Sequence, residues 1–202
     1  MKLCLTTERL LLREFTDDDL DNLVELDRDP EVMRYISGGV PTARESVRIE
    51  FLPRFLRSYE REPGFGIWAV LDKSAGRFLG RMSLELEHEE NGRDARLGFR
   101  LRRPEWSKGY ATEGSRALIE KGFLELKLAR VSASTYEHNV ASRRVMEKCG
   151  MRLRRRYRPT LEELAAHSSS SAAATTIWAG DEVEYAIERG EWYAGKPGES
   201  TP

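Results

Sequence analysis

The spacing of apolar side chains changes its period near Gly64, and this change limits the chain to few fold classes. Between residues 47 and 59 apolar side chains recur every four positions, which is typical of one face of a helix. From 65 to 71 every second residue is apolar, which is typical of a strand whose side chains alternate between two faces. Helices followed by neighbouring strands favour a mixed α+β domain over an all-α or all-β one.

The rest of the chain extends this pattern into an ordered set of elements. The expected elements are a strand over 10–15, helices near 20–27 and 42–60, strands over 65–71, 78–86 and 97–101, a helix over 110–127, a strand over 131–136, a helix over 140–149, and strands over 151–157 and 183–187. Pro30 and the Gly-Gly-Val-Pro stretch at 38–41 are expected to interrupt the helical region.

These elements predict one α+β domain over residues 1–192. Its mixed, mostly antiparallel sheet has six or seven strands and is flanked by about four helices. A Ser/Ala-rich loop near 159–180 and a flexible tail over 193–202 are expected to lie outside the packed core.

Composition excludes several classes of protein. The 202 residues carry 33 Lys and Arg against 34 Asp and Glu, and this balance argues against a general nucleic-acid binder, which needs excess cations to displace counterions. No apolar run approaches the ~18 residues of a membrane helix. The two cysteines and three histidines lie far apart and offer no metal-binding spacing. We therefore expect a cytoplasmic protein without a metal site.

A first group of polar residues lies between a predicted strand and the long helix that follows it. Helix N-termini offer unpaired N–H groups and partial positive charge, which suit a phosphate. Gly109 lets an anion approach the backbone closely, and Lys108, Arg102 and Arg103 add positive charge. The alternative is an ordinary strand-to-helix turn with solvated basic side chains.

A second group covers the helix that ends before Gly150. Asn139, Ser142, Met146 and Cys149 share one helix face by their spacing. A polar residue on an apolar face needs a partner, because burying it unpaired costs roughly 1–3 kcal/mol. Asn139 as a helix cap, with Ser142 bonded to the preceding turn, is the simpler alternative. The charged residues are expected to point away: Arg143, Arg144, Glu147 and Lys148.

Together the two groups resemble the GNAT N-acetyltransferase superfamily, and in particular its RimJ/RimL branch of ribosomal-protein N-terminal acetyltransferases. That branch reads W-G-x-G-Y-A-T-E after its fourth strand and N-x-x-S-x-x-V-x-E-K-x-G-F after its fifth. The matching residues are Trp106, Gly109, Tyr110, Ala111, Thr112 and Glu113, then Asn139, Ser142, Val145, Glu147, Lys148 and Gly150. The resemblance covers about residues 6–192. Ser107 and Met151 depart from it, standing where Gly and Phe are usual.

The resemblance implies a sheet splayed between the fourth and fifth strands, and an acyltransferase that uses acetyl-CoA and no metal. The acetyl group would pass to a protein N-terminal α-amino group or a small-molecule amine, by direct transfer in a ternary complex. The residues implied in holding acetyl-CoA are Phe99, Leu101, Ser107, Lys108, Gly109, Tyr110, Ala111, Thr112, Asn139 and Ser142. The oligomeric state is left open, a homodimer included.

The resemblance also suggests catalytic roles. Many members carry a Tyr seven residues after the Asn to assist the leaving thiolate, but that position is Met146 here, so Ser142 is predicted to do so. Asn139 would hold the pantetheine arm. Glu85 is the candidate general base, acting through a water, with Glu87 as the alternative. For either carboxylate, a solvated strand end is the competing interpretation.

Two other functions are compatible with the sequence: a non-catalytic acyl-CoA-binding module, and an RNA- or ribosome-associated protein. The arginines at 152, 154, 156 and 158 share a predicted strand face, which is solvated or else contacts the 3′-phosphate of CoA or an acidic partner. Charge is also segregated: residues 17–31 carry eight acidic side chains and residues 143–158 eight basic ones. With the resemblance, this predicts an acidic acceptor side and a basic donor side.

Overall fold

The computed structural model describes residues 2–89, 92–158, 160 and 180–195. Its strands are β1 Leu3–Thr6, β2 Leu10–Glu14, β3 Gly66–Asp72, β4 Phe78–Glu89, β5 Gly92–Leu101, β6 Arg130–Tyr136, β7 Arg152–Tyr157 and β8 Glu182–Glu188. Its α-helices are α1 Leu20–Arg28, α2 Pro30–Ser37, α3 Arg44–Ser46, α4 Leu52–Arg61, α5 Tyr110–Leu124, α6 Val140–Lys148 and α8 Arg189–Ala194. The expected Ser/Ala-rich loop and most of the expected tail lie outside the described residues.

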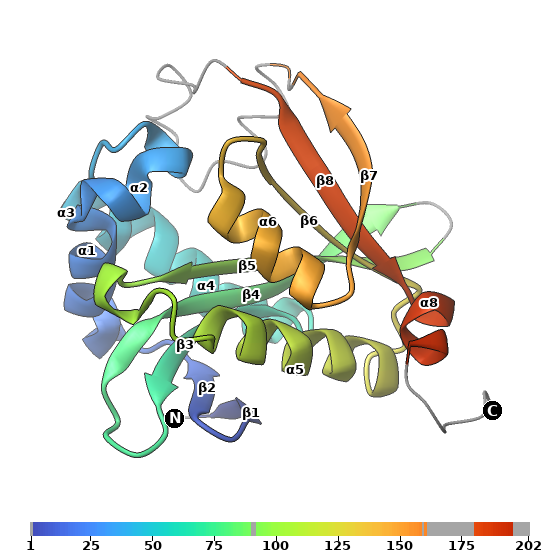
Figure 1. The fold of residues 1–202 in the computed structure, drawn as a ribbon. Coiled ribbons are helices and arrows are strands. Elements are labelled where there is room, and N and C mark those ends of the chain that lie inside the picture. The colour runs from blue at the N-terminus through green and yellow to red at the C-terminus, as the bar shows by residue number, and fades with distance from the viewer. Residues whose placement is uncertain (1, 90–91, 159, 161–179, 196–202) are drawn as a thin grey trace.

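The strands form one sheet in the order β1-β2-β3-β4-β5-β6-β8-β7 (Figure 1). All neighbours run antiparallel except β5 and β6, which are parallel. The predicted α+β class and mostly antiparallel sheet are therefore confirmed. The sheet has eight strands rather than six or seven because β1 adds a short edge strand, paired with β2, that the apolar pattern did not predict.

The N-terminal helices differ from the prediction in two places. Pro30 begins α2 instead of interrupting it, because Asp29 caps the helix and proline fits the first helical position, where no N–H donor is needed. The helix expected over 42–60 contains a π-helical segment at Val47–Phe51, directly before Pro53. Pro53 has no N–H to donate to residue 49, so a regular α-helix cannot continue through it.

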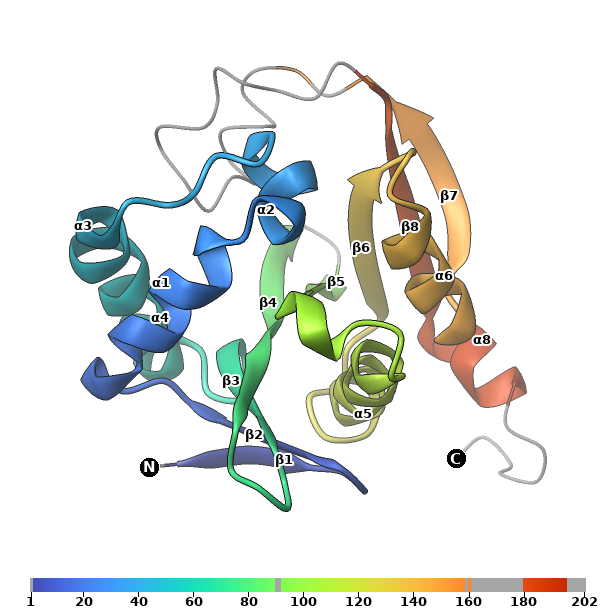
Figure 2. The same ribbon diagram turned by 60° about the vertical axis from the view of Figure 1, so that its left-hand side comes forward.

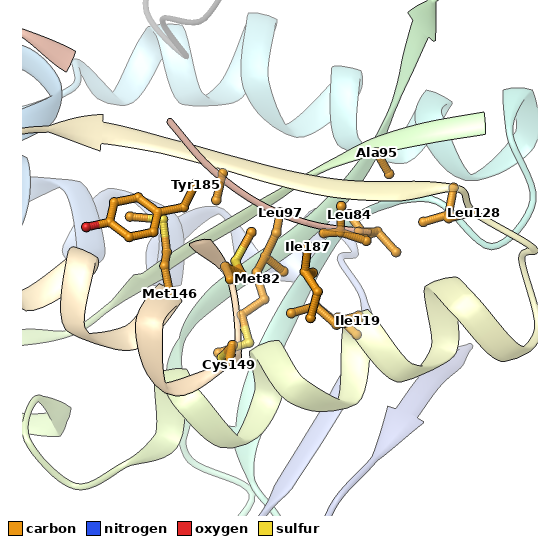
Figure 3. Close-up of a cluster of buried hydrophobic side chains, with 14 of the residues drawn as sticks. Met82, Leu84, Ala95, Leu97, Ile119, Leu128, Met146, Cys149, Tyr185 and Ile187 are labelled. Carbon is orange, nitrogen blue, oxygen red and sulfur yellow. The ribbon is translucent and has the colours of Figure 1, made fainter. Parts of the chain in front are cut away.

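Helices cover both faces of the sheet (Figures 1 and 2). On one face α5 and α6 pack over a buried cluster that includes Met82, Leu118 and Met146. On the other face α1 and α4 pack over a second cluster that includes Leu26 and Phe55. Figure 3 shows part of the first cluster, to which β4, α5, α6 and β8 all contribute side chains.

The sheet opens between β5 and β6. These strands pair only from Asp94 with Arg130 to Arg96 with Ser132. Beyond that point β5 continues to Leu101 and β6 to Tyr136 without pairing, and the two strands diverge (Figure 2). The predicted splay is confirmed, and it leaves the inner edge of β5 without a strand partner.

Candidate active site

The unpaired edge of β5 presents backbone groups to the splay. The carbonyl of Arg93 accepts from Ala129 ahead of β6, at 2.9 Å, whereas the N–H of Arg102 donates to Leu79 on the β4 side, at 2.8 Å. The β4–β5 register is continuous, and alternate residues of a strand face the same neighbour. The odd-numbered groups of β5, including those of Phe99 and Leu101, therefore face the splay. The carbonyl of Leu101 accepts from Trp106 Nε1 at 2.8 Å, so its N–H and the groups of Phe99 are the ones left for an extended ligand.

The loop before α5 supplies a set of free N–H donors. Within the described residues, no backbone N–H from Ser107 to Thr112 donates a hydrogen bond, and the first helical bond is from Glu113 to the carbonyl of Gly109, at 3.0 Å. Ser107 and Gly109 have φ of 61° and 84°, in the left-handed region. Donors left free at a helix N-terminus form an anion-binding concavity. This geometry matches what the sequence predicts for a phosphate.

Two of the basic side chains predicted near this loop, those of Lys108 and Arg102, are bound to carboxylates. Lys108 Nζ lies 3.0 Å from the buried carboxylate of Glu105, which Arg77 also binds. The hydrogen bond from Arg77 is the main reason that the pKa of Glu105 is lowered. Arg102 pairs with Glu25 on α1. The anion site thus consists chiefly of backbone donors, and Lys108 contributes its N–H rather than a free ammonium.

At the start of α6, Asn139 acts as the helix cap. Its Oδ1 accepts from the N–H of Ser142 at 3.3 Å, and its Nδ2 donates to Thr135 Oγ1 at 3.0 Å. The capping alternative is therefore correct for Asn139. The Ser142 hydroxyl is partly exposed and binds no group among the described residues, so it remains available to a ligand.

Two charged residues of α6 do not point away as predicted. Tyr185 of β8 donates its hydroxyl to Glu147 at 2.9 Å and accepts from Arg143 Nε at 3.2 Å. β8 lies between β6 and β7, which brings Tyr185 under α6 beside Met146 (Figure 3). No local sequence pattern indicates this contact, because Tyr185 lies about 40 residues after α6 along the chain.

The two candidate bases share one sheet face, as predicted, but their surroundings differ. Glu87 accepts from Arg96 Nε at 2.7 Å and from Ser132 Oγ at 3.0 Å. Arg96 and Ser132 are the last pair before β5 and β6 diverge, so Glu87 holds the two strands together at the apex of the splay. Glu85 is exposed and binds no described group. Glu85, rather than Glu87, is free to accept a proton.

One residue of α2 contacts the turn on the other side of the splay. Tyr35 of α2 donates its hydroxyl to the carbonyl of His138, at 3.1 Å, in the turn that precedes Asn139. The contact joins the N-terminal helices to the segment that carries Asn139 and Ser142. The two sides of the splay are therefore linked by a contact between α2 and this turn.

Ion pairs reduce the charge segregation that is seen along the sequence. Acidic residues of the N-terminal helices pair with arginines: Asp19 with Arg13, Asp21 with Arg44, Glu25 with Arg102, Asp27 with Arg100 and Glu31 with Arg34. The arginines of β7 also pair: Arg152 and Arg154 with Glu191, Arg155 with Glu184, Arg156 with Glu137 and Asp181, and Arg158 with Asp181. Five of the eight acidic side chains and five of the eight basic ones are thus paired, which reduces the net charge that each segment presents.

This geometry can be compared with known proteins. A sequence model of the family described as "Acetyltransferase (GNAT) domain" matches residues 9–152. The chain belongs to the GNAT acetyltransferase family. Membership makes it an acyltransferase, and the acetyl groups that this family transfers go to amines.

A relative and two solved structures illustrate the similarity. FsC-acetyl coenzyme A-N(2)-transacetylase of Aspergillus fumigatus is 34% identical over 73% of this chain and 64% of its own length. A GNAT acetyltransferase of Bacillus anthracis is 27% identical, with a TM-score of 0.71 over 92% of this chain and 98% of its own. RimL, an α-N-acetyltransferase of ribosomal L7/L12 solved with coenzyme A, is 15% identical, with a TM-score of 0.72 over 93% and 98%. The last likeness shows the fold alone.

The described residues include neither a metal-binding cluster nor a membrane-spanning helix. No cluster of three or more His, Cys, Asp or Glu side chains there could hold a metal ion. No helix there has both the length and the apolar character needed to cross a membrane.

Proposed function

We propose that this GNAT protein is an acetyl-CoA-dependent N-acetyltransferase that acts by direct transfer in a ternary complex. The acceptor is a protein N-terminal α-amino group or a small-molecule amine. The observation that carries the proposal is the run of free N–H groups from Ser107 to Thr112 beside the unpaired edge of β5. CoA combines a pyrophosphate with an extended amide-bearing arm, and these two features of the chain complement those two parts.

The donor is placed by backbone groups. The pyrophosphate accepts from the N–H groups at the start of α5, where the helix dipole also favours negative charge. The pantetheine amides pair with the edge of β5 near Phe99 and Leu101, as an added strand would. The N–H of Leu101 then donates to the thioester carbonyl and stabilises the oxyanion of the transition state.

The transfer forms a C–N bond and breaks the C–S bond of the thioester. The amine must be neutral to attack, and an α-amino group, with a pKa near 8, loses its proton more easily than a lysine side chain, near 10.4. Glu85 takes the amine proton through a water. The Ser142 hydroxyl donates a hydrogen bond to the leaving thiolate, while Asn139 keeps Ser142 in place by capping α6.

Two of the similar proteins support this acceptor class by their activities. RimL acetylates a protein α-amino group, and the fungal relative is named as an N-transacetylase that uses acetyl coenzyme A. We place the chain in the RimJ/RimL-like branch on its two motifs. The Tyr35 contact across the splay supports a bordered acceptor space rather than an open surface.

Thiol release from acetyl-CoA, measured across a panel of amines and short peptides, tests the proposal. Acceptor-dependent release is expected, with calorimetric binding of CoA. Binding without release under any acceptor would favour a non-catalytic acyl-CoA-binding module. Absence of CoA binding would overturn the proposal and favour the RNA- or ribosome-associated alternative.

The role of Ser142 has its own test. Ser142→Ala should lower kcat while the Kd of acetyl-CoA changes little, because the hydroxyl acts on the leaving group. Arg144→Ala, an exposed change on the same helix, is the matched control and should alter neither quantity. Unchanged turnover in Ser142→Ala would remove Ser142 from the mechanism.

A further inference from the structure

Arg9 lies behind the loop that carries the free N–H groups. It belongs to the turn between β1 and β2, yet its Nη1 donates to the carbonyl of Lys108 at 3.0 Å. Its guanidinium covers the ring of Tyr110, 4.7 Å from the centroid. Its Nη2 would lie 3.3 Å from a Cβ placed on Gly109. One arginine therefore contacts Lys108 and Tyr110 and closes off the space beside Gly109.

Glu113 fixes Arg9 in this position. Its carboxylate accepts from the Thr7 hydroxyl at 2.5 Å, from the N–H of Arg9 at 2.9 Å and from Arg9 Nε at 2.6 Å. Burial alone would raise the pKa of Glu113, but these hydrogen bonds outweigh it and lower the pKa. Glu113 is thus the anchor that ties the β1–β2 turn to the first turn of α5, and not only a carboxylate that complements the helix dipole.

The contact with Lys108 has a directional consequence for the loop. In a trans peptide the carbonyl oxygen and the next N–H point in opposite directions, and no described peptide here is cis. Because Arg9 holds the Lys108 carbonyl on its own side, the N–H of Gly109 is turned to the opposite, open side.

We propose that Arg9 is a positioning residue for the pyrophosphate of the donor. It orients the N–H groups around Gly109 toward the phosphates, while its own charge is paired with Glu113. The inference rests on the proposed use of acetyl-CoA and deepens it. It assigns the phosphate affinity of this loop to a residue about a hundred positions away in sequence, which the loop motif itself does not contain.

Three acetyl donors that differ in the phosphate groups they carry separate this role from a general structural one. Arg9→Met should raise the KM and Kd of acetyl-CoA by roughly 10- to 100-fold, as expected for losing charge-assisted hydrogen bonds. The loss should be the same for 3′-dephospho-acetyl-CoA, which keeps the pyrophosphate. Turnover of S-acetylpantetheine, which has no pyrophosphate, should not change. Arg9→Lys should restore little, since an ammonium cannot replace the planar fork.

Lys73→Met is the matched control. Lys73 follows β3 and donates to the carbonyl of Thr7 at 3.1 Å, so it is a second cation bonded to the β1–β2 turn, and no contact joins it to the loop among the described residues. It should leave all three donors unaffected. An equal loss of Arg9→Met activity with S-acetylpantetheine, or an unchanged Kd for acetyl-CoA, would overturn the proposal. If wild-type protein bound no CoA in calorimetry, the proposed function itself would fail, and that result is distinct from either outcome.

Discussion

The guanidinium of Arg100 on β5 and the carboxylate of Asp27 on α1 form a buried ion pair, with Nη1 and Oδ1 2.5 Å apart. The side chains are only 8% and 9% exposed, and Thr42 donates to the second carboxylate oxygen at 3.0 Å. Arg81 lies directly opposite Arg100 in the sheet. Burial, and then the charge of Arg100, lower the pKa of Arg81 to about 9. Asp27 therefore acts on both buried guanidiniums and joins α1 to the strand that borders the splay.

Asp27→Asn should destabilise the fold by about 3–5 kcal/mol, because removing one partner of a buried pair leaves the other charge without compensation. Glu25→Gln is the matched control on the same helix: its carboxylate is 59% exposed and pairs with Arg102, so its loss should cost less than about 1 kcal/mol. Urea unfolding at pH 7 measures both free energies of unfolding. Similar small losses for the two variants would contradict the role assigned to Asp27.

The same pair predicts an acid-sensitive component of stability. Burial would raise the pKa of Asp27, but Arg100 and Arg81 outweigh it and the pKa is lowered. A carboxyl whose pKa is lower in the folded state contributes stability above its unfolded pKa of about 3.9 and loses it as pH falls through the folded value. The difference in unfolding free energy between wild type and Asp27→Asn should therefore be constant from about pH 7 to 5 and shrink below about pH 4. A series of urea titrations across this range checks the expectation.

The central strands were predictable from the sequence because burial of at least one face imposes a period of two on apolar residues. β1 was not, since an edge strand of four residues with no fully buried side chain carries no such period. Pro30 was misread for another reason: proline both ends helices and begins them, and only the cap by Asp29 decides which. The π-helical segment before Pro53 likewise left the spacing of its apolar residues intact, so the sequence showed one helix.

The candidate site divides along similar lines. The Asn139 cap and the glycine before α5 have local signatures, so the residue pattern was enough to select them as candidates. The hydrogen-bond and ion-pair partners of Glu113, Glu147 and Lys108 have no local signature, because most of them come from elements distant in sequence. Charge counts over a segment also failed as a guide to the surface. They record which charges are present but not which ones the fold brings together.

Glu85 and Glu87 provide a test with two isosteric changes on one strand face. Glu85→Gln should lower kcat by roughly 10²-fold or more, as for loss of a general base, while the free energy of unfolding stays within about 0.5 kcal/mol. Glu87→Gln should instead cost about 1–2 kcal/mol of stability, because it weakens the bonds to Arg96 and Ser132 at the apex of the splay. Steady-state kinetics and urea unfolding on both variants separate the roles. The reverse pattern would make Glu87 the base.

Gly114 sets how closely α5 approaches the sheet. A Cβ there would lie 2.4 Å from Met82 Sδ and 3.3 Å from Leu10 Cδ1, so Gly114→Ala must push the helix or these core side chains apart. Overpacking of this kind costs about 1–3 kcal/mol. Gly190→Ala in α8 is the control: its Cβ would meet nothing within 4 Å, so the higher helix propensity of alanine should stabilise the fold by up to about 1 kcal/mol. Thermal unfolding should show Tm shifts of opposite sign, about 2–4 °C per kcal/mol for a domain of this size. Because α5 carries the free N–H groups at its start, Gly114→Ala should also weaken CoA binding, whereas Gly190→Ala should not. A stable Gly114→Ala variant with unchanged CoA affinity would show that the site does not require the close approach of α5 to the sheet.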